Sequence, residues 1–264
     1  MISVRPRQLV VVLFVALLHA GAAVAVVRFF SVRWLIAAFV AGQFFGIVGI
    51  SACYHRQLAH RAFEARAPLL FLHLLCGVLA GQGGPIAWVR AHRAHHAHPD
   101  SELDPHSPRN GFWRAHLGWL LESRRRAAIL ELARPPADLL ESSMIVWFER
   151  LTLPLLAATF VALYAAGGWA AVCWLGCFRI VLTLQTSWAV NSVGHRFGYR
   201  NFDTADDSRN NVALSVLAAG EAYHNNHHRF PRSARIGLRW FEFDSAWWYL
   251  AAMRRLGLID GMLP

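Results

Sequence analysis

The sequence predicts an all-α integral membrane protein, with four transmembrane helices in two hairpins and a cytosolic helical cap that holds two metal ions. Three observations support this prediction. Of the 264 residues, 56% are apolar and only 16% are charged, whereas about a quarter of the residues in a soluble domain are charged. The apolar residues form long stretches, and nine of the 14 histidines recur at short spacings in the polar segments. This composition excludes a disordered chain and a disulfide scaffold, and it favours one domain over residues 1–264.

Four apolar stretches have the length of a bilayer-spanning helix, which needs about 20 residues. They cover residues 9–27, 34–54, 145–166 and 169–190. The first is longer than the apolar core of a signal peptide and a second span follows it at once, so we interpret it as an uncleaved helix. The third carries Glu149 and Arg150 near its start, where we expect the membrane interface. A shorter stretch, residues 68–80, is expected to be interfacial or to form a buried helix beneath the polar part.

The basic residues are all arginines, and their distribution predicts the orientation in the membrane. The segment after the second span carries 11 of the 26, and the segment after the fourth carries nine. Because positively charged loops stay in the cytoplasm, we expect a cytosolic cap built from residues 55–144 and 191–264. Arg179 lies inside the fourth span and is expected to face protein rather than lipid. The net charge of +10 would also suit nucleic acid, but the arginines flank the spans, so we reject a nucleic-acid partner.

Nine histidines form four groups that all fall on the predicted cytosolic side. On an α-helix, residues i, i+3 and i+4 share a face, so each His-x-x-His-His box can converge on one point. His55 and His60 are five residues apart, roughly 140° around an α-helix, so they should not share a face; they reach different metals or the helix ends between them. Nine imidazoles are too many for one ion, which favours two metal ions with four or five ligands each. The nine are His55, His60, His92, His95, His96, His195, His224, His227 and His228.

A single box of this kind is often only a solvated helix face, but four groups on one side of the membrane make that alternative weak. The five remaining histidines are expected to be structural, although His106, in an Asp-Pro-His sequence, can support a ligand. Imidazole suits zinc, copper, iron and nickel, so the ligands alone leave the metal open. Neutral imidazoles around two cations need nearby carboxylates. The candidates are Asp104, Asp206, Asp207 and Glu221.

The order and spacing of these motifs resemble the membrane fatty-acyl desaturases, the family of the stearoyl-CoA desaturases and their bacterial relatives. The resemblance runs from the second span almost to the end of the chain. It rests on the pair His55 and His60 and on three segments, residues 82–96, 188–195 and 220–228. The family has four membrane helices and a cytosolic cap with a di-iron centre. The resemblance therefore implies two iron ions at the nine histidines, with Asn191 reaching one of them through water.

The resemblance also implies an O₂-dependent enzyme that takes two external electrons and inserts a cis double bond into a fatty-acyl chain. It places Gln82, Trp88 and Trp188, with Thr183, along the kink of an acyl tunnel; for the tryptophans the alternative is anchoring at the membrane interface. The sequence contains no motif of a fused cytochrome b5, so a separate ferredoxin, or a cytochrome with its reductase, is expected as electron donor. The expected location is the bacterial cytoplasmic membrane, with the active site on the cytosolic side.

One segment departs from the acyl-CoA members of this family. Where they carry a basic pair that helps to hold the CoA phosphates, this chain has Glu122 and Ser123 followed by Arg124, Arg125 and Arg126. The three arginines can bind phosphates or lie against anionic lipid headgroups. The acyl carrier therefore stays open between CoA, acyl carrier protein and lipid.

Two other functions compete with desaturation. A hydroxylase on the same di-iron scaffold differs only in the step after the first C–H abstraction, and nothing in the motifs separates the two outcomes. A metal transporter should place its ligands at mid-membrane on broken helices, whereas all nine histidines lie just outside the predicted spans. The resemblance therefore predicts an oxidoreductase that desaturates acyl chains, with the hydroxylase kept as the alternative.

Overall fold

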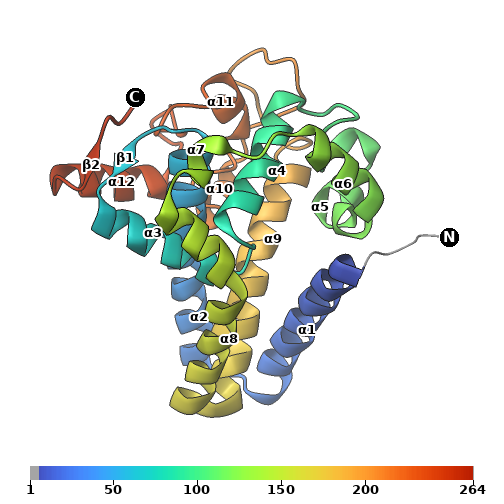
Figure 1. Ribbon diagram of the computed structural model, residues 1–264, viewed down its shortest axis with the longest axis vertical. Helices are drawn as coiled ribbons and strands as arrows, with labels where there is room; N and C mark the ends of the chain where they lie inside the picture. Colours follow the sequence, from blue (N-terminus) through green and yellow to red (C-terminus); the bar gives the residue numbers. More distant parts are fainter. Residues whose placement is uncertain (1–5, 264) are drawn as a thin grey trace.

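The computed structural model describes the backbone of residues 6–263 and the side chains of residues 9–122 and 127–263. Within this part the chain is mainly helical: long helices form a stem, and shorter elements form a cap at one end of it (Figure 1). The stem consists of α1 (Pro6–Arg28), α2 (Val32–Phe45), η1 (Gly46–Ala59), α8 (Ser143–Ala171), η4 (Val172–Phe178) and α9 (Arg179–Ser192). The other elements are β1 (Glu64–Ala65), α3 (Ala67–Leu79), α4 (Pro85–Ala97), η2 (Pro108–Asn110), α5 (Phe112–His116), η3 (Gly118–Leu121), α6 (Ser123–Leu132), α7 (Ala137–Leu140), α10 (Val212–Leu217), α11 (His224–Arg229), α12 (Ser245–Arg255) and β2 (Ile259–Asp260).

Among residues 6–263, three helical stretches are long and apolar enough to cross a membrane: Leu9–Arg28, Val32–Ala59 and Ser143–Ser192. The last has 50 residues and contains a break, because Gly167 and Gly168 have non-helical dihedral angles. Gly168 has a φ of 60°, which glycine adopts without strain. Figure 1 shows the chain reversing here, so that α8 runs away from the cap and α9 returns to it. The stem is thus a bundle of apolar helices, as the sequence predicts.

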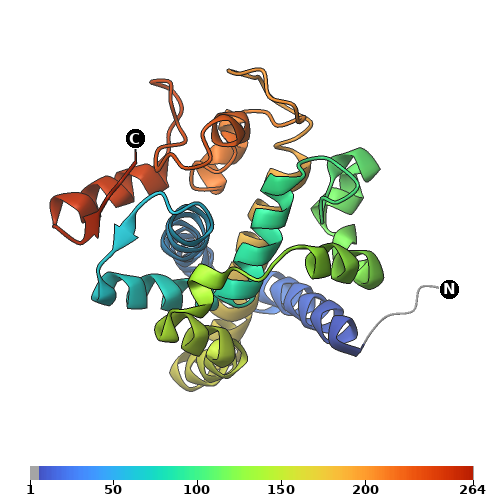
Figure 2. The same ribbon diagram turned by 45° about the horizontal axis from the view of Figure 1, so that its top comes forward.

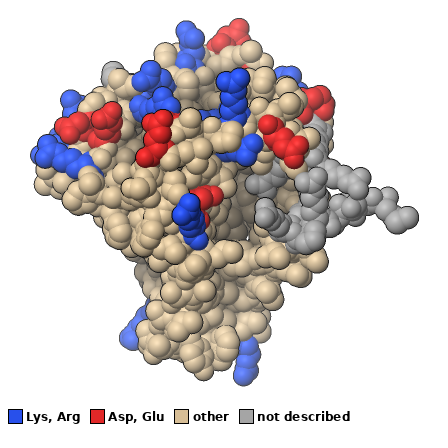
Figure 3. Space-filling view, in the orientation of Figure 1, with Lys and Arg blue, Asp and Glu red and all other residues tan. Residues whose placement is uncertain are grey.

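Charge divides the molecule along its long axis (Figure 3). On the face shown, charged side chains gather over the cap and at the far tip of the stem, and the surface between them carries few. The turn between α1 and α2, at the far end from the cap, is flanked by Arg28, the last residue of α1, and Arg33 of α2. A broad apolar belt with charged ends is typical of a protein embedded in a bilayer.

The second stretch differs from the prediction in length and winding. We predicted a span that ends at residue 54, but the helix continues to Ala59, so His55 lies inside it. Its second half, η1, is a π-helix, in which backbone hydrogen bonds join residues five apart. Accordingly, His60 N donates to His55 O at 3.1 Å. Arg93 of α4 donates to Ala59 O at 3.0 Å. This bond satisfies a carbonyl at the end of η1 that has no hydrogen-bond partner within the helix.

Close backbone contacts join the stem helices to their neighbours. Gly49 of η1 lies directly against the backbone of Cys76 in α3, where a Cβ atom would overlap the Cys76 carbonyl. Arg179 at the start of α9 is buried, its Nε donates to Leu175 O at 2.6 Å, and its guanidinium lies over the Phe45 ring. The prediction that Arg179 faces protein is therefore confirmed.

Three segments far apart in the sequence meet at the cap end of η1. Figure 2, which tilts the cap toward the viewer, shows the sea-green α4 and the orange α11 beside the end of the blue η1. The strands β1 and β2 pair antiparallel, with Glu64 opposite Asp260 and Ala65 opposite Ile259, and so join the segment after η1 to the C-terminal region. The histidines lie on the three helices that converge here, and on the chain that follows α9.

Candidate metal centre

His55 and His60 share one face at the end of η1. Their ring centroids are 4.8 Å apart, and their ring nitrogens belong to the same group. The prediction that they do not share a face, or that they reach different metals, is wrong, because it assumed α-helical winding. The other alternative, that the helix ends between them, is confirmed, since η1 ends at Ala59. In a π-helix, residues five apart lie roughly one turn above each other.

The helix α4 carries three histidines and is fixed at both ends. Glu149 of α8 accepts a hydrogen bond from the backbone N–H of Ile86 at 2.8 Å, which caps the helix start. Near the other end, Arg93 binds Asp138 of α7 through two hydrogen bonds of 2.8 Å. The spacing of His92, His95 and His96 directs their rings toward the convergence point.

The helix α11 carries three more histidines and has only six residues, too few to be stable alone. Two buried asparagines within the box hold it in place. Asn226 accepts a hydrogen bond from Asn210 Nδ2 at 2.8 Å and donates one to Glu242 Oε2 at 2.8 Å. The Oδ1 atom of Asn225 accepts two backbone N–H groups from residues 201–202, each at 2.9 Å. The spacing of the histidines predicted no role for these asparagines.

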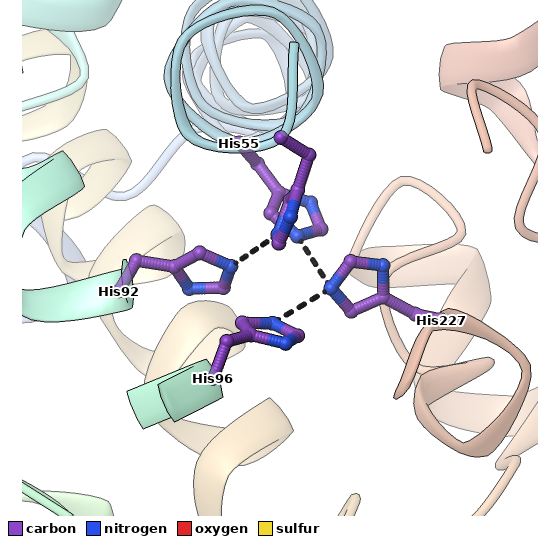
Figure 4. Close-up of side chains that lie close together, drawn as sticks. His55, His92, His96 and His227 are labelled. Carbon is purple, nitrogen blue, oxygen red and sulfur yellow. Dashed lines mark hydrogen bonds between the residues drawn. The ribbon is translucent and has the colours of Figure 1, made fainter. Parts of the chain in front are cut away.

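The nine predicted histidines converge into two groups, one of five and one of four. Within each group all the candidate ligand atoms lie within 4.8 Å of one another. Figure 4 shows four members of the larger group with their rings turned toward a common point. The groups are His55, His60, His92, His96 and His227, and His95, His195, His224 and His228. The neighbours His95 and His96 thus serve different groups, which their spacing did not reveal.

The nitrogen contacts within these groups fit bound cations better than hydrogen bonds. His227 Nε2 lies 2.9 Å from both His55 Nε2 and His96 Nε2, yet one imidazole nitrogen offers only a single proton or a single lone pair. The buried His195 Nε2 atom has no hydrogen-bond partner among the described residues. A cation among the nitrogens would satisfy every lone pair at once, since metal–nitrogen bonds of about 2.1 Å place neighbouring ligands roughly 3 Å apart.

Four buried or half-buried carboxylates hold the opposite nitrogen, Nδ1, of four histidines. This orients each ring with Nε2 toward the interior of its group. Asp104, Asp206 and Glu221 are confirmed as such neighbours, whereas Asp207 is not one, because its carboxylate pairs with Arg109 near the surface. The pairs are His95 with Asp104 (2.9 Å), His228 with Asp206 (2.9 Å), His195 with Asp100 (3.0 Å) and His55 with Glu221.

Two contributors were missed from the sequence. Asp100 stands four residues after His96, a proximity that could have drawn attention to it. Arg56, directly after His55, is fully buried and donates to Asp244 (2.9 Å) and Glu221 (3.2 Å). It thereby fixes Glu221 against His55.

The pKa values follow from burial and these pairs. Burial lowers the pKa of His92, His96, His224 and His227 well below the usual value, and neighbouring histidines lower it further. These rings are therefore neutral, the form that binds metals. Burial would raise the pKa of Asp104, but the nearby His95 and His106 outweigh it, so this pKa is lowered and the carboxylate is ionised.

A cavity of about 360 Å³ extends from the histidines into the stem. Such a size is usual for small-molecule sites. The histidine end includes His55, His92, His95 and His224, and the walls continue along α2, α8 and α9. All five residues predicted for substrate or water contacts line it: Gln82, Trp88, Thr183, Trp188 and Asn191.

Hydrogen bonds fix the polar part of this wall. Gln82 Nε2 donates to Ser187 Oγ (2.7 Å) and Thr183 O (3.1 Å), and Gln82 Oε1 accepts from Trp88 Nε1 (3.2 Å). The Trp88 ring stacks on His92 with centroids 5.0 Å apart. The hydroxyl of Thr183 is bound to backbone carbonyls. Its methyl group is therefore the part left to face the cavity.

The comparisons with known proteins decide the family. The profile of the fatty acid desaturases matches residues 31–258. The chain belongs to the fatty acid desaturase family. It is 41% identical over 213 residues to the sn-1 stearoyl-lipid 9-desaturase of Anabaena variabilis, covering 81% of this chain and 78% of that protein. It is 35% identical over 257 residues to the icosanoyl-CoA 5-desaturase of Limnanthes douglasii, covering 96% of this chain and 71% of that protein.

Membership of the desaturase family implies an oxidoreductase of lipid metabolism that acts on fatty-acyl chains. The histidine groups provide a site suited to the metal of such an enzyme. The segment predicted to contact an acyl carrier or lipid headgroups, Arg124 to Arg126, lies on the backbone of α6, but these side chains fall outside the described residues.

Proposed function

We propose that this desaturase uses O₂ and two iron ions, held by the nine histidines, to insert a cis double bond into a saturated fatty-acyl chain. The observation that carries the proposal is the position of the two histidine groups at one end of a mainly apolar cavity. Zinc is redox-inert, whereas iron with O₂ can oxidise an unactivated C–H bond. A hydroxylase is the alternative outcome of the same chemistry.

The protein's own residues position the reactants. The carboxylates of Asp100, Asp104, Asp206 and Glu221 hold Nδ1–H of their histidines, so Nε2 of each stays directed inward. Trp88 and Trp188 provide an apolar wall beside the histidines, and Asn191 adds an amide suited to hold a water molecule. Fixing one part of the acyl chain against this wall selects the carbon pair that reacts.

We further propose four membrane spans, formed by α1, by α2 with η1, by α8, and by η4 with α9. The reversal of the chain at Gly167 and Gly168 and the apolar belt support this arrangement. The concentration of arginines in the cap supports a cytosolic position for it. The membrane is then the bacterial cytoplasmic membrane, and the electron donor is a separate ferredoxin or cytochrome that reaches the cap from the cytosol. Complementary charge would speed its association.

Lipid analysis tests the reaction itself. Cells that express the protein should accumulate an unsaturated acyl chain absent from control cells, with the double-bond position found by mass spectrometry. A hydroxylated chain would instead establish the hydroxylase.

The variant His227→Ala tests the metal site. It removes the nitrogen that contacts two others in the larger group, so we expect product formation to be lost and bound iron to fall. The matched control is His98→Ala, because His98 is exposed and belongs to neither histidine group. An active His227→Ala protein with full iron content would refute the ligand assignment.

A further inference from the structure

The two halves of α1 are packed very differently. Its second half lies against η4, with Leu18, Ala22 and Ala25 buried and Gly21 in contact with Cys177. In its first half, none of the side chains from residue 9 to residue 17 is buried. Figure 1 shows α1 leaning away from α9 toward the N-terminal end. The two helices therefore diverge as they approach the cap.

A second cavity, of about 270 Å³, lies in the wedge-shaped space between the first half of α1 and α9, which we call the wedge. Val12 and Ala16 line it from α1, and Leu117 and Leu121 line it from the opposite side. At its edge, His19 Nε2 contacts Gln185 Nε2 of α9 at 3.0 Å, which ties the two helices together. Apart from this edge the walls of the wedge are apolar.

The second cavity adjoins the cavity that leads to the histidines. Val15, Leu120 and Trp188 line both cavities, so the two cavities adjoin at these three side chains. Val11 and Phe14 of α1 also line the larger cavity. The first half of α1 therefore forms one wall of a route from the outer surface of the stem to the histidine groups.

The wedge lies beside a candidate membrane span. Leu9–Arg28 is a candidate membrane span, and the exposed side chains around the wedge, such as Leu13 and Leu17, are apolar. In a membrane, the surroundings of the wedge are lipid acyl chains. A chain that passes from the bilayer into an apolar cavity never has to be exposed to water, unlike a chain that arrives from the cytosol.

We infer that the acyl chain enters sideways from the bilayer, between α1 and the Leu117–Leu121 segment, and that the substrate is an acyl chain of a membrane glycerolipid. This inference rests on the proposed function. It predicts that the same wedge admits lipid chains whether or not iron is bound, since none of the residues lining it is among the nine histidines.

Photo-cross-linking tests the entrance without relying on activity. The protein is reconstituted into phosphatidylcholine vesicles that contain a phosphatidylcholine with a diazirine-tagged palmitoyl chain, then irradiated, and labelled peptides are identified by mass spectrometry. We expect labelling of residues 117–121 and of the wedge side of α1. Labelling confined to the lipid-facing side of α1 would overturn the inference.

Two tryptophan variants on neighbouring positions sharpen this test. Ala16→Trp fills the mouth of the second cavity, and we expect it to reduce labelling of residues 117–121 at least tenfold. Leu17→Trp adds the same side chain on the same helix, but Leu17 is 69% exposed and lines neither cavity, so labelling should stay within twofold of wild type. Equal labelling in the two variants would overturn the inference.

An activity measurement separates this inference from the proposed function. Wild-type protein and Ala16→Trp, loaded with iron and supplied with O₂ and a reduced ferredoxin, are each given a saturated chain on phosphatidylcholine in vesicles or on CoA in detergent. We expect desaturation of the lipid-linked chain, reduced at least tenfold in Ala16→Trp. Desaturation of the CoA-linked chain alone would overturn the lateral entrance and leave the proposed function standing. With no desaturation of either, the proposed function fails, and the cross-linking result still decides the entrance.

Discussion

For four of the nine histidines, a carboxylate determines which ring nitrogen faces the metal-binding groups. Asp104 is the most enclosed of them: it is fully buried and accepts from His95 Nδ1, Asp100 N and His106 N, all at 2.9 Å. A carboxylate in this position keeps the proton on Nδ1 and makes Nε2 a better ligand. The carboxylate on the second nitrogen therefore contributes to the affinity of the site for metal.

The variant Asp104→Asn tests this role. It keeps the size of the side chain but removes the charge that holds His95, so we expect metal affinity to fall about 10- to 100-fold. Iron content and chelator competition measure the change, and thermal unfolding checks that the protein is folded. The control is Asp203→Asn, because Asp203 is fully exposed and its carboxylate lies 3.7 Å from Arg200. Unchanged iron affinity in folded Asp104→Asn would contradict the role.

At the scale of the element, the π-helix η1 determines where His55 and His60 lie in the metal-binding groups. Its winding places His55 and His60 on one face, and its close contact with α3 fixes the rotation of that face. The contact depends on Gly49, because any side chain there would overlap the backbone of Cys76. The same helix offers an internal comparison at Gly46, where a Cβ would find its nearest neighbour, Thr183 Cγ2, at an ordinary 3.9 Å.

We therefore expect opposite effects of two glycine substitutions on η1. Gly49→Ala should lower the free energy of unfolding by about 1–3 kcal/mol, the usual cost of overpacking. Gly46→Ala should raise it by up to about 1 kcal/mol, since alanine favours helix. Thermal unfolding in detergent, followed by tryptophan fluorescence, measures both. Equal stability of the two variants would show that α3 does not approach η1 this closely.

A second test at this scale concerns the short helix α7, which anchors α4. Hydrogen bonds from Arg93, and then from Arg61, lower the pKa of Asp138 to about 2 against the opposing effect of partial burial. The pKa of Asp138 is lower in the folded protein than in the unfolded chain, where it is about 3.9. The ion pair therefore makes its full contribution to the stability of the fold at pH values above about 3.9. This contribution is lost as the pH falls through about 2.

Asp138→Asn should therefore lower the free energy of unfolding by about 1 kcal/mol at pH 7, a value reduced for solvent screening because the pair is partly exposed. The difference in melting temperature from wild type, about 2 °C, should shrink as the pH is lowered toward 3. Asp203→Asn again serves as the control and should show no such trend. A difference in melting temperature that increases toward low pH would contradict the lowered pKa of Asp138.

At the scale of the whole molecule, the apolar stem and the charged cap lie along one long axis, which crosses the membrane in the proposed four-span arrangement. The nine histidines lie at the junction of stem and cap, where the cavity from the stem meets the buried carboxylates of the cap. In the proposed function, an acyl chain in this cavity remains in an apolar environment while its reactive part approaches a polar, metal-binding interior. The same axis predicts that the cap and the turn after α1 lie on opposite sides of the bilayer.

Cysteine labelling tests this orientation. The four native cysteines are buried, so labelling of an introduced, exposed cysteine can be distinguished from labelling of the native ones. A membrane-impermeant maleimide should label Phe30→Cys, in the exposed turn between α1 and α2, from outside intact spheroplasts. It should label Asp203→Cys, on the cap, only in inverted vesicles. Labelling of both from the same side would refute the four-span orientation.

The sequence by itself determined the apolar helices, the candidate metal-binding histidines and the family, because each of these depends on composition or on short-range spacing. Helical periodicity predicts which face a His-x-x-His-His box presents, and hydropathy predicts a span without any knowledge of its partners. The same reasoning failed at His55 and His60, because local spacing does not reveal π-helical winding.

Only the tertiary structure decided how the histidines divide into two groups and which carboxylates support them. His95 and His96 are neighbours in sequence but belong to different groups, and Asp100 supports His195 from 95 residues away. The cavity beside α1 was equally beyond the sequence, because it exists only where two spans diverge. Such features depend on contacts between distant segments, and these form only when the chain packs around the end of η1.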